Sequence, residues 1–295
     1  MASNPPPEPT PEQLVANLVL LLNLEPTGND TFVGRRRSDG TGRVFGGQAI
    51  AQALGAASRT VDADRAVHSL HAYFLRPGSD ALPIEYRVMR DLDGRSFSNR
   101  RVVASQDGKP ILNLVTSFQM PVDGPGHQHP DMPDVPQPEE LEPDLVSARK
   151  IADKLPEGTL KTLITRPQPI DFRSVEPRDW LHMETRPPKA HVWFKTVAPL
   201  PADVEMQRTF LAYISDFQLL GTAMQPVGVP TGNIRVASLD HAMWFHEDFA
   251  LDDWLLYATD SPWAGHARGY GRGQIFTRDG TLVASVAQEG MIRHV

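Results

Sequence analysis

The chain has 295 residues and a formal net charge of −7, with 40% hydrophobic and 22% charged residues. This length suits two domains of about 100 to 150 residues each, and the composition is that of a globular protein, which excludes a chain disordered throughout. Because acidic and basic residues are interspersed, the charge pattern argues against a nucleic-acid surface and a polybasic membrane patch. The absence of cysteine excludes disulfides, thiolate nucleophiles and cysteine-ligated metals.

The N-terminal segment combines a proline-rich stretch with an apolar run. The prolines at positions 5, 6, 7, 9 and 11 predict a disordered tail over residues 1–13. The run from Leu14 to Leu24 follows no basic segment, so it lacks the pattern of a signal peptide, and it is shorter than the roughly 18 apolar residues that span a membrane. We interpret it as a packed helix and expect a cytoplasmic protein that has no membrane partner.

A first domain is expected over residues 14–121. The motif Phe45-Gly46-Gly47-Gln48 opens an alanine-rich helix that continues to Ala57, and a strand from His68 to Phe74 follows. Two further strands, Ser98 to Ser105 and Ile111 to Phe118, flank Asp107-Gly108, a dipeptide typical of tight hairpin turns. From Pro121 to Pro143 the chain is dense in proline, glycine and acidic residues. We therefore expect a linker over residues 122–165, with a helix from Leu145 to Leu163.

The second domain, expected over residues 166–295, repeats the order of elements in the first. Strand-like sequence resumes at Ile170, a helical pattern covers Met206 to Met224, and a strand is expected from Ile234 to Phe245. A second Asp-Gly turn, at Asp279-Gly280, joins the expected strands Tyr270 to Phe276 and Leu282 to Met291. Because a helix of small residues permits close approach, each antiparallel sheet can wrap around one central helix. The pattern predicts an α+β fold in which this unit occurs twice.

Three polar residues occupy apolar positions of the second domain. Asp216 lies beside the apolar stripe of its expected helix, Ser238 shares a strand face with Ile234 and Val236, and Gln288 continues the apolar phase of the last strand. Each also has a structural interpretation: an aspartate satisfied by a nearby helix end or by an arginine such as Arg268, a hydroxyl bonded to backbone, and a glutamine that braces a loop.

Three such residues on neighbouring elements favour a shared polar site. An aspartate accepts a proton, and a serine hydroxyl and a glutamine amide hold a water by hydrogen bonds. The three residues therefore suit activation of a water, and N–H groups at a helix start suit stabilisation of an oxyanion. No metal site is indicated, because His241 and His246 would lie on opposite faces of a regular strand. Asp240 and His241 also point to opposite faces, which argues against a catalytic triad with Ser238.

Motifs in both halves resemble the acyl-CoA thioesterase II family, in consistent order from about Leu18 to Arg293. The motifs are Val44-Phe45-Gly46-Gly47-Gln48, His68-Ser69-Leu70-His71-Ala72-Tyr73-Phe74-Leu75-Arg76-Pro77-Gly78, Leu211-Ala212-Tyr213-Ile214-Ser215-Asp216, Leu239-Asp240-His241-Ala242-Met243-Trp244-Phe245-His246 and Val286-Ala287-Gln288-Glu289-Gly290. The resemblance implies a double hotdog fold of two tandem domains. It also implies hydrolysis of fatty acyl-CoA to free fatty acid and coenzyme A, without metal or cofactor.

The catalytic residues that the resemblance implies are Asp216, Ser238 and Gln288, which orient the attacking water. Ser238 departs from the threonine that is usual in the family, and it keeps the hydroxyl but loses the methyl group that limits rotation. The C-terminal Arg293-His294-Val295 differs from the peroxisomal address of some members, which supports the expected cytoplasmic location.

Two alternatives remain open from sequence. A hotdog enoyl-CoA hydratase would need an aspartate with a histidine, and the expected helix of Asp216 carries no histidine. A non-catalytic acyl-CoA binding protein would keep the pocket but could lose Asp216 or Gln288. The expected partners are an acyl-CoA substrate and further copies of the chain in a homo-oligomer, and no nucleic acid.

Overall fold

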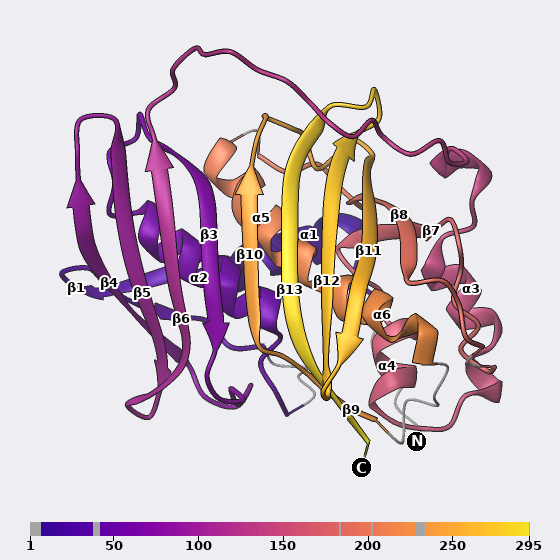
Figure 1. Cartoon of the computed structure of the whole chain (residues 1–295). Coiled ribbons are helices and arrows are strands. Elements are labelled where there is room, and N and C mark those ends of the chain that lie inside the picture. Colours follow the sequence, from indigo (N-terminus) through magenta and orange to yellow (C-terminus); the bar gives the residue numbers. More distant parts are fainter. Residues whose placement is uncertain (1–6, 38–41, 183, 202, 228–233, 295) are drawn as a thin grey trace.

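A computed structural model describes residues 7–37, 42–182, 184–201, 203–227 and 234–294. Over these residues the strands form one antiparallel sheet in the order β1-β2-β4-β5-β6-β3-β10-β13-β12-β11-β8-β7, with β9 paired to β13 (Figure 1). The first half of the chain supplies α1 (Pro11–Leu22), β1 (Leu24–Gly28), β2 (Thr31–Gly34), α2 (Gly46–Ser58), β3 (Ala66–Phe74), β4 (Ile84–Asp93), β5 (Phe97–Gln106) and β6 (Lys109–Gln119).

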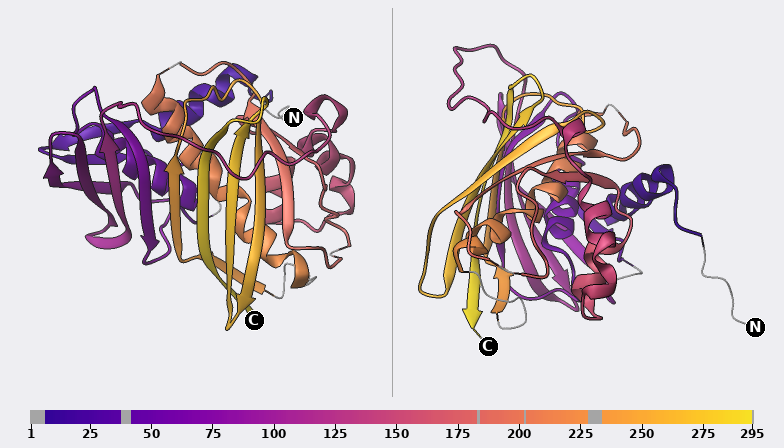
Figure 2. Two further views of the ribbon diagram at one scale, coloured as in Figure 1. Left: turned by 45° about the horizontal axis from the view of Figure 1, so that its top comes forward. Right: turned by 90° about the vertical axis from the view of Figure 1, so that its right-hand side faces the viewer.

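The second half begins with β7 (Ile170–Ser174) and β8 (Lys189–Thr196). Its central helical segment comprises α5 (Val204–Ile214), the 3-10 turn η3 (Ser215–Phe217), α6 (Leu219–Met224) and η4 (Gln225–Val227). The remaining strands are β9 (Ile234–Ser238), β10 (Asp240–Phe245), β11 (Leu255–Gly265), β12 (Arg268–Thr277) and β13 (Leu282–His294). The helices lie on one face of the sheet (Figure 2). None of the helices in the described ranges is long and apolar enough to cross a membrane.

The first helix begins earlier than expected from sequence. The N-terminal tail was predicted to reach residue 13, but α1 starts at Pro11. Proline is tolerated at the first helical position, where its missing N–H would have no partner, and Thr10 completes a capping box with Gln13. Residues 1–6 of the predicted tail lie outside the described residues.

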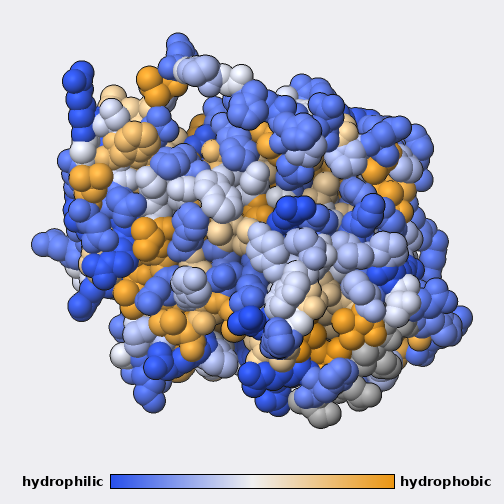
Figure 3. Space-filling model, in the orientation of Figure 1, coloured by the Kyte–Doolittle hydropathy of each residue, from blue (hydrophilic) through white to orange (hydrophobic). Residues whose placement is uncertain are grey.

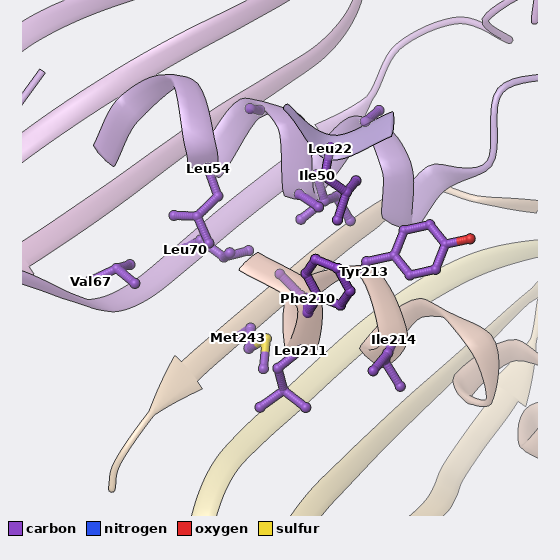
Figure 4. Packing of buried hydrophobic residues seen from close by; sticks show 14 of the residues in the cluster. Leu22, Ile50, Leu54, Val67, Leu70, Phe210, Leu211, Tyr213, Ile214 and Met243 are labelled. Carbon is purple, nitrogen blue, oxygen red and sulfur yellow. The ribbon is translucent and has the colours of Figure 1, made fainter. Parts of the chain in front are cut away.

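The two halves meet along one strand pair and one helix pair. Strand β3 pairs antiparallel with β10, with Leu70 opposite Met243. On the helix side, α2 packs against α5, and Ile50 and Phe210 are fully buried in the core between them (Figure 4). Since both the sheet and the core are continuous across the junction, the halves share their buried surface.

The connection between the halves crosses the opposite face of the sheet and leaves part of that face open. Trp193 donates an Nε1–H bond to Pro136 O at 2.9 Å, and Leu282 N donates to the Gln128 side chain. Over the first half, Figure 3 shows apolar patches among polar residues on this face, and Tyr73 of β3 and Val115 of β6 are exposed. The connecting segment packs Met132 and Val135 against the second-half cluster that contains Trp193 and Phe276.

Limited proteolysis is expected to cut first within residues 121–130, all of which are exposed. A protease of broad specificity is required, because residues 121–143 contain no lysine or arginine. The cleaved halves should co-elute on size exclusion, since the β3–β10 pairing and the α2–α5 contact do not depend on the connection. Two separately eluting, folded halves would contradict this shared core.

The predicted linker helix from Leu145 to Leu163 is broken in the structure. It comprises α3 (Asp144–Lys150), η2 (Ala152–Lys154) and α4 (Thr159–Thr165), preceded by the 3-10 turn η1 (Pro138–Glu140). Pro156 cannot donate a helical hydrogen bond, and Gly158 has φ +149°, which is outside the helical region. The resulting pair of short helices forms one wall of the cavity described next.

Candidate active site

A cavity of about 1240 Å³ lies between α3 and α4 on one side and β7, β8, η3 and α6 on the other. Its apolar lining includes Leu160, Leu163, Ile164, Phe172 and Phe217. Its charged lining includes Arg43, Arg166, Arg178 and Lys195. Asp216 also lines this space, near the start of α2. A largely apolar cavity with a few convergent charged groups is the usual form of a small-molecule site.

Asp216 lies at an interruption of the helix that was predicted to be continuous. The segment from Met206 to Met224 divides into α5, η3 and α6, and Asp216 is in the 3-10 turn. Its Oδ2 accepts the Gly47 N–H at 2.8 Å, and its Oδ1 has no protein hydrogen-bond partner, although the side chain is only 4% exposed. Burial raises the pKa of Asp216 to about 7, against the opposing effect of the Gly47 N–H and the nearby Gln288 amide. This carboxyl group is suited to proton transfer near neutral pH.

Two glycines allow α2 to approach the carboxyl group. A Cβ added at Gly46 would lie 2.7 Å from Asp216 Oδ2, and one at Gly47 would lie 2.4 Å from the backbone oxygen of Tyr213. Any larger residue would push α2 away from η3. The Gly47 N–H at this helix start donates to Asp216 and is therefore not available to an oxyanion.

Ser238 and Gln288 are in contact with each other. Gln288 Nε2 donates to Ser238 Oγ at 2.6 Å, and Gln288 is buried in β13 as its phase predicted. The proposed bracing of a loop by Gln288 is not what the structure shows. Its amide instead bonds to side chains from two other strands.

The strand predicted from Ile234 to Phe245 is wrong as a single element. It divides at Leu239 into β9 and β10. The Leu239 N–H donates to Glu289 O, and Leu239 O accepts the Phe74 N–H. The break shifts the alternation, so that in β10 His241, Met243 and Phe245 are buried, while Trp244, expected on the same face as Ser238, is exposed. The prediction of a shared strand face is therefore correct for Ser238 and Ile234, and it is wrong for the residues after Leu239.

His241 is a further member of this site, which its position in the sequence did not predict. Its Nδ1 lies 2.9 Å from Gln288 Oε1, its Nε2 lies 2.9 Å from Ser215 Oγ, and its Nδ1 is 3.9 Å from Asp216 Oδ1. Burial lowers the pKa of His241 to about 4, with a smaller opposing effect of the Gln288 hydrogen bond, so the ring is neutral at pH 7. The helical segment of Asp216 carries no histidine, as expected, but His241 approaches Asp216 from another element, β10.

The structure also tests the alternative partners considered for these residues. Arg268 was a candidate partner for Asp216, but it pairs with Glu289 at 3.2 Å. Asp240 points away from His241, as expected, and accepts the Glu289 N–H at 2.6 Å. Within the described ranges, no three His, Asp or Glu side chains gather closely enough to hold a metal ion.

Comparisons with known proteins agree with the fold and identify the family. The family model described as acyl-CoA thioesterase matches residues 168–291, and the model for an acyl-CoA thioesterase N-terminal domain matches residues 35–119. The chain is 39% identical over 282 residues to acyl-CoA thioesterase 2 of Haemophilus influenzae, covering 95% of this chain and 98% of that protein. It is also 39% identical over 286 residues to human acyl-coenzyme A thioesterase 8, covering 92% and 88%.

Solved structures of thioesterases and hot dog fold proteins are also similar to this chain. Acyl-CoA thioesterase II TesB2 from Mycobacterium marinum has a TM-score of 0.77 and 37% identity, covering 95% of this chain and 98% of that chain. A protein described as having a hot dog fold, from Alicyclobacillus acidocaldarius, has a TM-score of 0.75 at 17% identity, and this likeness concerns the fold alone. The predicted double hotdog fold is confirmed. The chain therefore belongs to the acyl-CoA thioesterase family and is a thioester hydrolase.

Proposed function

We propose that the protein hydrolyses fatty acyl-CoA with Asp216 as the general base that activates a water. The observation that carries this proposal is the Asp216 carboxyl group, buried beside a cavity with Oδ1 unpartnered and a pKa of about 7. As the water oxygen attacks the thioester carbonyl carbon, Oδ1 takes a water proton. The C–S bond then breaks, and the proton passes to the departing thiolate, which yields free acid and coenzyme A.

Gln288 and Ser238 are proposed to hold the attacking water. Ser238 Oγ accepts from Gln288 Nε2, so its own hydroxyl proton remains to be donated. The Gln288 amide also counteracts the rise in the Asp216 pKa, and we assign its second N–H to the Asp216 side of the site on that ground. A water between these groups would be oriented with a proton toward Asp216, and fixing this geometry lowers the entropic part of the barrier.

The cavity lining supports a substrate with an apolar chain and an anionic carrier. Leu160, Leu163 and Ile164 line it from α4, which suits an acyl chain. Arg178 lies over the Trp180 ring at 5.0 Å, and Lys195 lies on another wall. Coenzyme A carries phosphates, and fixed cations bind phosphates by charge-assisted hydrogen bonds.

Release of free thiol from palmitoyl-CoA, followed with a thiol-detecting dye, tests the proposed function. The expected result is continuous release, without labelling of Ser238 by a serine-directed fluorophosphonate. Hydration of an enoyl-CoA without thiol release would support the hydratase, and binding without turnover would support a non-catalytic binder. The buried ring nitrogens of His241 bond to Ser215 and Gln288, which disfavours the hydratase, because they do not face the cavity.

Turnover is expected to increase with pH through about 7, because Asp216 must be ionised to accept a proton. The contribution of Asp216 to stability should change in the opposite direction. Its folded pKa lies above the ordinary value of 3.8, so the folded state favours the protonated carboxyl, and this contribution falls as pH rises from about 4 to about 7. Because the lowered pKa of His241 acts with the opposite sign over the same range, the sign for Asp216 is checked by the difference in melting temperature between wild type and Asp216→Asn from pH 4 to pH 8, and the sign for turnover by the wild-type kcat. A kcat independent of pH around 7 would contradict the role of Asp216.

A further inference from the structure

We propose that His241 is a positioning residue that fixes the orientation of the Gln288 amide, so that its NH₂ group faces Ser238 and Asp216. This inference deepens the proposed function and rests on it, since it explains how the water-holding amide keeps its donor toward the base. His241 is not among the residues that line the cavity, and its side chain is fully buried. It therefore acts through Gln288 and does not touch substrate.

The hydrogen-bond partners determine which ring nitrogen carries the proton. Gln288 Oε1 is an acceptor and lies 2.9 Å from Nδ1, so Nδ1 must donate to it. The ring is neutral at pH 7, which makes Nε2 an acceptor, and the Ser215 hydroxyl 2.9 Å away is its donor. The same hydroxyl can donate to Ala212 O at 3.0 Å, which is its acceptor in the alternative Nε2–H form of the ring, and in the proposed Nδ1–H form its proton turns to Nε2.

The opposite amide orientation is disfavoured by the surrounding groups. It would place the Gln288 carbonyl oxygen toward Ser238 and the Asp216 carboxylate, where two negatively polarised oxygens would face each other. An Nδ1–H on His241 would then also meet the amide N–H, so donor would face donor. The Nδ1–H tautomer and the orientation in which Gln288 donates to the catalytic side therefore require each other.

The chain of bonds also includes the turn that carries the base. Ser215 directly precedes Asp216 in η3, and Tyr257 O–H donates to the Ser215 carbonyl at 2.9 Å. Ser215 and His241 are fully buried. Three side-chain hydrogen bonds therefore run from Ser215 through His241 and Gln288 to Ser238. They link the turn that carries Asp216 to the groups proposed to hold the water.

Two substitutions of His241 separate the donor from the bulk of the ring. His241→Leu fills the space but removes the Nδ1 donor, and kcat should fall on the order of 10- to 100-fold with KM nearly unchanged. His241→Asn places an amide N–H where Nδ1 was, and most of the kcat should be retained, while Ser215 can turn its proton to Ala212 O. A kcat of His241→Leu equal to that of the wild type, or equal losses in both variants, would overturn the proposal.

A double-mutant cycle provides a readout that a merely structural histidine would not affect. Once Gln288→Leu has removed the amide, His241→Leu should cause little further loss of kcat. Independent, multiplicative losses would count against an action through Gln288. If Gln288→Leu and Asp216→Asn themselves leave kcat unchanged, the proposed function fails. If they lower it and His241→Leu does not, only this inference fails.

The wild-type protein offers a test that does not depend on the activity of any variant. Nitrogen-15 NMR of the labelled histidines distinguishes a neutral ring protonated at Nδ1 from one protonated at Nε2. The His241 signal, assigned by its loss in His241→Asn, should report the Nδ1–H form at pH 7. The Nε2–H form, or a charged ring, would overturn the assignment.

Discussion

Replacement of Asp216 by asparagine is expected to lower kcat by about 100-fold or more, the usual scale for loss of a positioned base. The asparagine side chain keeps the size of the carboxyl group, and its oxygen can still accept the Gly47 N–H. It cannot take the proton of the attacking water. Binding of a non-hydrolysable acyl-CoA analogue should change little, because most of the cavity lining lies on other elements.

The same substitution should raise the melting temperature at pH 8. At pH 8 the wild type holds Asp216 as an ionised, buried carboxylate. Because its pKa is about 7 in the folded state against an ordinary 3.8, this ionisation lowers the free energy of unfolding by on the order of a few kcal/mol, a loss that a neutral asparagine avoids. Asp240→Asn is the matched control, since its oxygen can still accept the Glu289 N–H and it is not part of the proposed site. A folded Asp216→Asn variant with near wild-type turnover would show that the carboxyl group is structural. A lower melting temperature with loss of analogue binding would show the same.

Replacement of Gln288 by leucine is expected to lower kcat on the order of 100-fold, with a small effect on KM. Leucine fills a similar volume in β13. It removes the amide N–H that donates to Ser238 and the amide oxygen that accepts from His241. The attacking water would lose its orientation, whereas the cavity that binds substrate would remain. Initial rates over a range of palmitoyl-CoA concentrations separate the two constants.

Gln274→Leu on the neighbouring strand β12 is the control for this change, because Gln274 is half-buried and lies opposite Ser285, three positions from Gln288 along β13. It should keep wild-type kcat. Loss of rate in both variants to the same extent, or a large increase in KM for Gln288→Leu alone, would assign the glutamine to folding or to substrate binding.

Local patterns in the sequence determined the elements and their internal order. The two Asp-Gly turns are present where expected: Asp107 and Gly108 have positive φ between β5 and β6, and Gly280 has φ +93° between β12 and β13. Each turn depends on residues adjacent in the chain, and glycine and aspartate tolerate this conformation with little strain. The buried phase of Gln288 was also predictable, because β13 is regular over that stretch.

Tertiary structure decided the breaks in elements and the partners of the polar groups. The interruptions at Leu239 and at Ser215 depend on bonds to Phe74, Glu289 and Tyr257, which belong to other strands. The pKa of Asp216 depends on burial and on an N–H donated by Gly47, 169 positions earlier in the chain. His241 was missed for the same reason, because the break at Leu239 changed which residues of β10 face the core. Sequence periodicity reports the local alternation of side chains, whereas proton affinity and hydrogen-bond partners arise from groups that only folding brings together.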